Sequence, residues 1–84
     1  MNEKPDHFAT LILSLAGAAQ MGLGLIANPQ TGKTEKNLGG AKDTITLIEV
    51  LKEKTKGNLT KEEEDLFDQI LFQLRMSYVE ESKK

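Results

Sequence analysis

Residues 8–27 read FATLILSLAGAAQMGLGLIA, twenty consecutive residues without a charged side chain. Apolar residues recur in this run at spacings of three and four, which is the period of an α-helix. Asp6 stands just before the run as a helix cap, and the Asn28-Pro29 pair after it disfavours helical backbone. The sequence therefore predicts a helix over about residues 7–27.

This first helix is long enough to raise the question of a membrane span, because about twenty apolar residues cross a bilayer. Gln20 and three glycines dilute its apolar character, and neither end carries the aromatic belt or lysine cluster that is typical of a span. A membrane-associated helix over residues 8–27 is therefore kept as the third of three hypotheses for the function.

A second helix is predicted over about residues 38–56. Asn37 is its cap, and Gly57 supplies the left-handed residue that stops it. Five residues form one broad apolar arc, which we expect to face the core. These residues are Ala41, Ile45, Leu47, Ile48 and Leu51.

A third helix is predicted over about residues 61–80. Thr60 and Glu63 form a capping box, in which each side chain accepts a hydrogen bond from the other residue's backbone N–H. Six residues line one face of this helix at helical spacing. They are Leu66, Phe67, Ile70, Leu71, Leu74 and Tyr78.

These three segments predict an all-α fold, since no alternating strand pattern occurs in the chain. We expect residues 1–84 to form a single helical domain, with a loop at residues 28–36 and disordered ends at residues 1–5 and 81–84. A chain of this length buries too little surface to be very stable alone. We therefore expect the three-helix bundle to be completed by homo-oligomerisation.

The first helix has two contrasting faces. We expect its apolar face to lie in the core, and that face holds Phe8, Leu11, Ile12, Leu15, Ala19, Leu23 and Ile26. The opposite face carries no charge, although exposed helix faces normally do. It consists mostly of small residues at coiled-coil spacing, which lets a second backbone approach closely.

The third helix carries a second apolar stripe on the side away from its core face. Two short helices cannot cover this stripe and also the back of the first helix. Each large apolar side chain left in water forgoes about 1.5–3 kcal/mol. We therefore expect a symmetric dimer in which the first helices pack together centrally. The candidate interface residues are Thr10, Leu13, Ser14, Gly17, Met21, Gly24, Phe72, Met76 and Val79.

Composition excludes several classes of function. The 84 residues include no cysteine and one histidine, His7, which excludes thiolate sites, cysteine nucleophiles and multi-histidine metal sites. The formal charge is −2 and aromatic residues make up 5%, which disfavours nucleic-acid binding. Asp6 and His7 have no third catalytic partner. We therefore predict that the chain is not an enzyme and has no catalytic, cofactor-binding or metal-binding residue.

Residues 27–34, ANPQTGKT, satisfy a loose form of the phosphate-binding loop, with Ala27 in place of the first glycine. That chemistry needs a strand before the loop and a helix directly after it. Neither is predicted here, so we interpret the segment as a polar turn closed by Gly32.

Charged residues of the third helix allow two further interpretations. The run Glu62–Asp65 suits the positive end of the helix dipole, and its consecutive side chains point in different directions rather than toward one ion. Arg75 lies beside Leu71 and Leu74, where it can pair with a carboxylate at a subunit boundary or remain solvated.

Several segments of the chain form an ordered series of signatures. They are DHF at 6–8, LSLA at 13–16, GLGLI at 22–26, NPQTGK at 28–33, NL at 37–38, AKDTI at 41–45, LKEKTKGNLT at 51–60, LR at 74–75 and YV at 78–79. In order and spacing they resemble the bacterial family catalogued as domain of unknown function 1844. The resemblance covers about residues 6–80 and implies a short helical protein of the bacterial cytoplasm. It implies no activity, cofactor or functional residue.

The biochemical role is not identified by the sequence. The leading hypothesis is a small non-enzymatic helical module for oligomerisation or protein interaction, with its own copies as partners and an unknown protein partner also allowed. The alternative is a helical bundle that binds a small apolar ligand or a lipid. No nucleic acid or cofactor is expected, and the expected location is the cytoplasm. Whether the 28–36 loop or the Lys54–Gly57 segment binds anything stays open.

Overall fold

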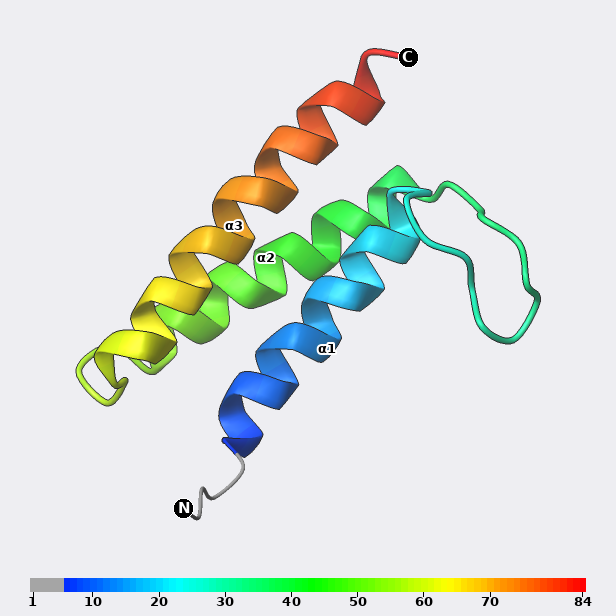
Figure 1. The fold of residues 1–84 in the computed structure, drawn as a ribbon. Helices are drawn as coiled ribbons and strands as arrows, with labels where there is room; N and C mark the ends of the chain where they lie inside the picture. Colours follow the sequence, from blue (N-terminus) through cyan, green and yellow to red (C-terminus); the bar gives the residue numbers. More distant parts are fainter. Residues whose placement is uncertain (1–5) are drawn as a thin grey trace.

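The computed structural model describes residues 6–84 and contains three α-helices: α1 (His7–Gly22), α2 (Leu38–Lys54) and α3 (Lys61–Ser82) (Figure 1). Within the described residues, the only β-type pairing is an isolated antiparallel bridge between Leu23 and Lys36. The predicted all-α, three-helix fold is therefore confirmed. The prediction for residues 1–5 lies outside the described residues.

The three predicted helix starts are confirmed by their capping hydrogen bonds. Asp6 Oδ1 accepts from Ala9 N–H at 3.0 Å, and Asn37 Oδ1 accepts from Gly40 N–H at 3.0 Å. Glu63 N–H donates to Thr60 Oγ1 at 3.1 Å, while Thr60 N–H donates to Glu63 Oε1 at 2.9 Å. Each cap satisfies backbone donors that have no partner inside the helix.

The end of the first helix was predicted wrongly, because α1 stops at Gly22 instead of Ala27. Gly24 adopts a left-handed backbone with φ of +78°. Its N–H donates to Met21 O, and Leu25 N–H donates to Gln20 O, both at 3.0 Å. This pair of bonds is a Schellman stop, which needs a residue that tolerates positive φ.

The other two helix ends differ by two residues each from the prediction. Helix α2 ends at Lys54 rather than at residue 56, and Gly57 has the expected left-handed backbone with φ of +89°. Helix α3 continues to Ser82 rather than ending at residue 80. Residues 81 and 82 are therefore helical, not disordered.

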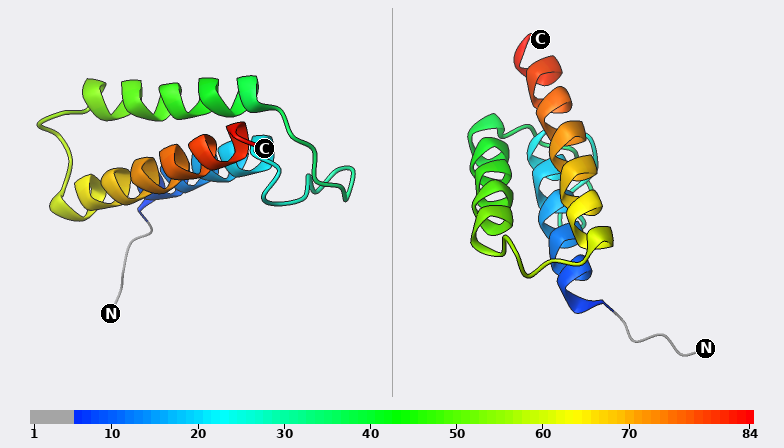
Figure 2. Two further views of the ribbon diagram at one scale, coloured as in Figure 1. Left: turned by 90° about the horizontal axis from the view of Figure 1, so that it is seen from above. Right: turned by 90° about the vertical axis from the view of Figure 1, so that its left-hand side faces the viewer.

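The helices form two layers, with α2 on one side and α1 together with α3 on the other (Figure 2). Helix α2 contacts both other helices more extensively than they contact each other. Its middle therefore supplies part of one shared core. The buried core residues are Ile12, Ala16, Ala19, Leu23, Ala41, Ile45, Ile48, Phe67, Ile70, Leu71 and Leu74.

Three residues expected in the core are exposed instead: Leu11, Ile26 and Leu47. Leu11 and Leu47 lie at the margins of their apolar arcs, and in the described chain no fourth helix covers those margins. Ile26 lies beyond the Schellman stop, so the helical period that placed it in the core does not apply to it.

Candidate functional site: an uncharged helical surface

The outward face of α1 is open to solvent and has no charged side chain. Thr10, Leu13 and Ser14 are exposed, and Gly17 and Met21 are partly exposed. A Cβ atom added at Gly17 would meet no atom within 4 Å. The structure thus places these five candidate residues on one exposed face of α1.

Two hydroxyl groups on this face are already bonded within the helix. Thr10 Oγ1 donates to Asp6 O at 3.2 Å, and Ser14 Oγ donates to Thr10 O at 2.9 Å. Such back-bonded hydroxyls have less need of water or of a polar partner. The face therefore behaves as more apolar than its sequence suggests.

Gly24 was expected on the same face, and the structure does not place it there. It belongs to the turn after α1, where its Cβ position would lie 3.7 Å from Lys36 Cβ. Gly24 therefore stops the helix and contacts the returning chain. It is removed from the candidate interface.

The stripe on α3 is the most exposed set of large apolar side chains among the candidate residues. Phe72 is 67% exposed, Met76 58% and Val79 50%. Between residues 69 and 79 the only charged side chain is Arg75. Because Arg75 turns toward α2, the stripe is bounded by uncharged neighbours for about three helical turns.

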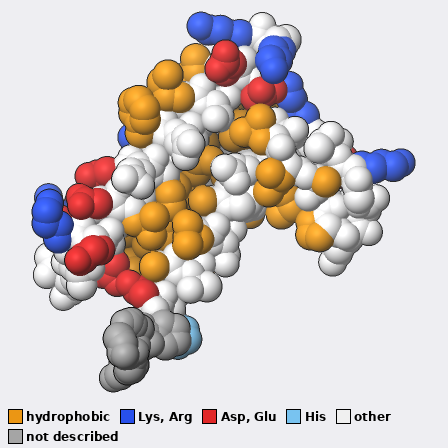
Figure 3. All heavy atoms as spheres, viewed as in Figure 1, with side chains coloured by type: hydrophobic (Ala, Val, Ile, Leu, Met, Phe, Trp, Pro, Cys, Tyr) orange, Lys and Arg blue, Asp and Glu red, His pale blue; other side chains and the backbone are white. Residues whose placement is uncertain are grey.

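The two layers differ sharply in surface character. Hydrophobic side chains gather along α1 and α3 on the face shown in Figure 3, and acidic side chains cluster at the start of α3. The exposed side of α2 is charged, with Lys42, Asp43, Glu53 and Lys54 among its residues. The exposed side of α2 thus mixes charged residues with the exposed apolar Leu47 and Val50, whereas the outward face of α1 and the middle of α3 are largely uncharged.

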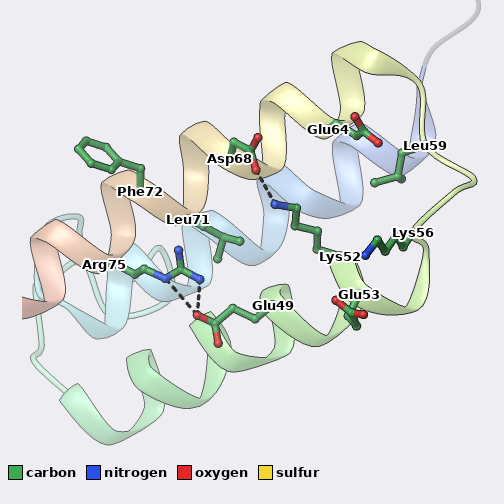
Figure 4. Close-up of a pocket in the computed structure, with 10 residues that line it drawn as sticks. All are labelled: Glu49, Lys52, Glu53, Lys56, Leu59, Glu64, Asp68, Leu71, Phe72 and Arg75. Atoms are coloured by element: carbon green, nitrogen blue, oxygen red, sulfur yellow. Dashed lines mark hydrogen bonds and ion pairs between the residues drawn. The ribbon is translucent and has the colours of Figure 1, made fainter.

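A groove of about 840 Å³ runs between α2 and α3 (Figure 4). Two ion pairs bridge it: Arg75 Nη2 lies 2.6 Å from Glu49 Oε2, and Lys52 Nζ bonds Asp68 Oδ1. Exposed pairs of this kind contribute about 0.2–1 kcal/mol each. Each helix carries its acidic residue before its basic one, and because α2 and α3 run antiparallel, opposite charges meet and the pairs favour the observed register of the two helices.

The partner of Arg75 lies within the same chain. Its Nε also donates to Glu49 Oε2, at 3.1 Å. The interpretation in which Arg75 meets a carboxylate at a subunit boundary is therefore replaced by an intramolecular pair between α2 and α3. Phe72, at the edge of the same groove, points its ring away from α2 (Figure 4).

The 28–36 loop is organised by hydrogen bonds to Asn28. Its side chain accepts from Gln30 N–H at 2.8 Å, and its carbonyl accepts from Gly32 N–H at 2.7 Å and from Thr31 N–H at 3.2 Å. A phosphate-binding loop needs such N–H groups free to point at the phosphate. Helix α2 starts only at Leu38. These two observations favour the polar turn.

An ion pair that the sequence did not indicate joins the same loop to α3. Lys36 Nζ lies 2.9 Å from Glu81 Oε1, and the Glu81 side chain is 11% exposed. Lys84 Nζ lies 3.1 Å from the other carboxylate oxygen. The hydrogen bonds from Lys36 and then from Lys84 hold the pKa of Glu81 below its ordinary value of 4.5.

We expect acidification to remove the ion pair between Lys36 and Glu81. A lowered pKa in the folded state means that the carboxylate stabilises the fold above pH 4.5, and that this contribution is lost as the pH falls through the folded pKa. We expect wild type to exceed Glu81→Gln in free energy of unfolding at neutral pH and the difference to vanish in acid. Urea unfolding across this pH range measures it, and a pH-independent difference would contradict the assignment.

The described residues 6–84 contain no group of three or more His, Asp or Glu side chains placed to hold a metal ion. None of the three helices within that range is both long and apolar enough to cross a membrane.

Comparison with known proteins gives one match. A family model described as Domain of unknown function (DUF1844) matches residues 5–80. No curated protein matches, and no solved structure matches. The family match agrees with the sequence signatures at residues 6–80 and covers nearly the whole chain.

Proposed function

The chain belongs to the DUF1844 family, and we propose that it is a non-enzymatic helical module that associates with its own copies through the uncharged faces of α1 and α3. The simplest assembly is a homodimer, because two-fold closure is the commonest form of soluble oligomer. The proposed location is the bacterial cytoplasm, as the family resemblance implies.

The observation that carries this proposal is the α3 stripe. Phe72, Met76 and Val79 are each at least 50% exposed, although a phenylalanine in water forgoes much of the free energy that its burial would release. A contiguous exposed apolar stripe of this kind commonly marks a protein contact. A second copy would cover it and would enlarge the small core of an 84-residue chain.

The uncharged face of α1 supports self-association rather than binding to a charged partner. Charged partners are selected by complementary charge, and this face offers neither sign. Two copies of a chain with formal charge −2 repel each other least where their contact surfaces carry no charge.

The alternative of an apolar ligand or lipid receives less support from the geometry. Phe67, Ile12, Leu23 and Ile48 belong to one hydrophobic cluster and are 0% exposed, so a ligand could not reach them without opening the core. The larger groove between α2 and α3 is bridged by ion pairs, and an apolar ligand would have to desolvate those charges. An apolar ligand is therefore the weaker proposal.

Light scattering coupled to gel filtration tests self-association. We expect a mass of twice the 9.3 kDa chain at micromolar concentration. Phe72→Glu places a charge in the contact and is expected to raise the dissociation constant at least ~10-fold. Val50→Glu makes an apolar-to-acid change at an exposed position on α2, outside the proposed contact, so it is the control and should leave the mass unchanged. A wild-type mass of 9.3 kDa would reject the proposal.

A further inference from the structure

One side of α3 has an ordered chemical pattern from Asp68 to the cap residue Lys83. Asp68, Phe72, Met76, Val79 and Lys83 follow one another at spacings of four, four, three and four residues. At 3.6 residues per turn, these spacings keep the five residues on one side of the helix. The side begins acidic, is apolar in the middle and ends basic.

The apolar middle of this side is almost symmetric about Met76. Phe72 lies four residues before Met76, and Val79 lies three residues after it. If two such helices run antiparallel with their Met76 residues facing each other, each Phe72 comes opposite the Val79 of the other copy. A two-fold interface requires this kind of reciprocal contact.

The charges favour the antiparallel direction. A parallel pair would place Asp68 beside Asp68 and Lys83 beside Lys83, so like charges would meet at both ends. The antiparallel pair places Lys83 opposite Asp68 at both ends. Asp68 bonds Lys52 of its own chain through Oδ1 only, and its side chain is 62% exposed, which leaves Oδ2 to bond Lys83 of the other copy. It also sets the acidic first turn of α3, which contains Glu62, Glu63 and Glu64, toward the lysine-bearing end of the other copy.

We infer that α3 packs antiparallel against α3 of a second copy about a two-fold axis at Met76, with Phe72 of each copy against Val79 of the other and Lys83 of each opposite Asp68 of the other. This geometry rests on the proposed self-association and specifies where that association takes place. It centres the two-fold contact on α3 rather than on α1, in contrast to the expectation that the first helices pack centrally.

Introduced cysteines test the geometry directly, because the chain has no cysteine of its own. A disulfide needs two Cα atoms within about 7 Å. Met76→Cys is expected to shift from monomer to covalent dimer on mild oxidation, since residue 76 faces its own copy across the axis. Val50→Cys, exposed on α2, is the control and should stay monomeric on the same denaturing gel.

A mixed pair distinguishes the antiparallel from the parallel arrangement. Phe72→Cys alone should not crosslink, because the two copies of residue 72 lie about 10 Å apart along the helix axis. Val79→Cys alone should not crosslink for the same reason. An equimolar mixture of the two variants should give a covalent heterodimer. Self-crosslinking of Phe72→Cys with no heterodimer would establish the parallel arrangement and overturn the inference.

Light scattering of the same variants under reducing conditions separates the two proposals. A dimer that crosslinks neither through Met76→Cys nor in the mixture would overturn the α3 geometry and leave self-association standing. A monomer would overturn both. All three positions are at least half exposed, so the substitutions leave the core of each subunit intact.

Discussion

Phe67→Ala is expected to lower the free energy of unfolding by about 3–5 kcal/mol. The Phe67 ring is 0% exposed and packs edge-on against Phe8, with ring centroids 5.9 Å apart. Its removal leaves a cavity between α1 and α3, where the backbone of two helices limits collapse. Small domains have about 5–15 kcal/mol of stability in total, so the variant should lie near the limit of folding. Urea unfolding followed by circular dichroism measures the loss.

Phe72→Ala is the matched control, because it removes the same side chain from the exposed side of the same helix. Its effect on a single subunit should be within about 0.5 kcal/mol. If α3 is a contact between copies, however, the loss should grow with protein concentration, since association stabilises the folded state by mass action. Two outcomes would contradict the assignment of Phe67 to the core and Phe72 to the exposed side of α3. One is a large loss of unfolding free energy for Phe72→Ala that does not depend on protein concentration, and the other is a small loss for Phe67→Ala.

The helix starts could be predicted because their signals are local. Asp6, Asn37 and the Thr60–Glu63 box each act on a backbone group three residues away. The geometry of such a bond is complete within one helical turn, so the rest of the fold changes it little. The left-handed backbone of Gly57, in the turn that follows α2, could be predicted for the same reason.

The end of α1 could not be predicted from local signals, because two stop signals compete there. Gly24 and the Asn28-Pro29 pair each end helices. Tertiary contacts decide in favour of Gly24: Asn37 N–H donates to Gly22 O at 2.7 Å, and Leu23 pairs with Lys36. These partners are distant in sequence, so no periodicity within residues 8–27 could indicate them.

The candidate surface shows the same limit. Helical periodicity correctly separated the buried Phe67 from the exposed Phe72 on α3. It could not place Leu11 and Leu47, whose exposure depends on how many helices surround the core. It also could not choose the partner of Arg75, because several carboxylates lie within reach of a long side chain. Glu49 is selected by the register of α2 against α3.

Gly22→Ala is expected to cost about 1–3 kcal/mol, because α1 and α2 meet at this residue without room for a side chain. A Cβ atom there would lie 3.1 Å from Ala41 Cβ, 3.2 Å from Ala41 N and 3.2 Å from Asn37 O. Two of these atoms are backbone, and the third cannot rotate away. The start of α2 must therefore move, which strains the hydrogen bond from Asn37 N–H to Gly22 O.

Gly17→Ala is the control for Gly22→Ala and also tests the face of α1. A Cβ atom at Gly17 meets nothing within 4 Å, and alanine in the interior of a helix is about 0.5–1 kcal/mol more favourable than glycine. We therefore expect Gly17→Ala to raise the midpoint of urea unfolding and Gly22→Ala to lower it. A decrease for Gly17→Ala that appears only at concentrations where the protein is dimeric would mean that a second copy packs closely on α1. That outcome would move the two-fold contact from α3 to α1, since only atoms from outside the subunit could crowd the Cβ position of Gly17.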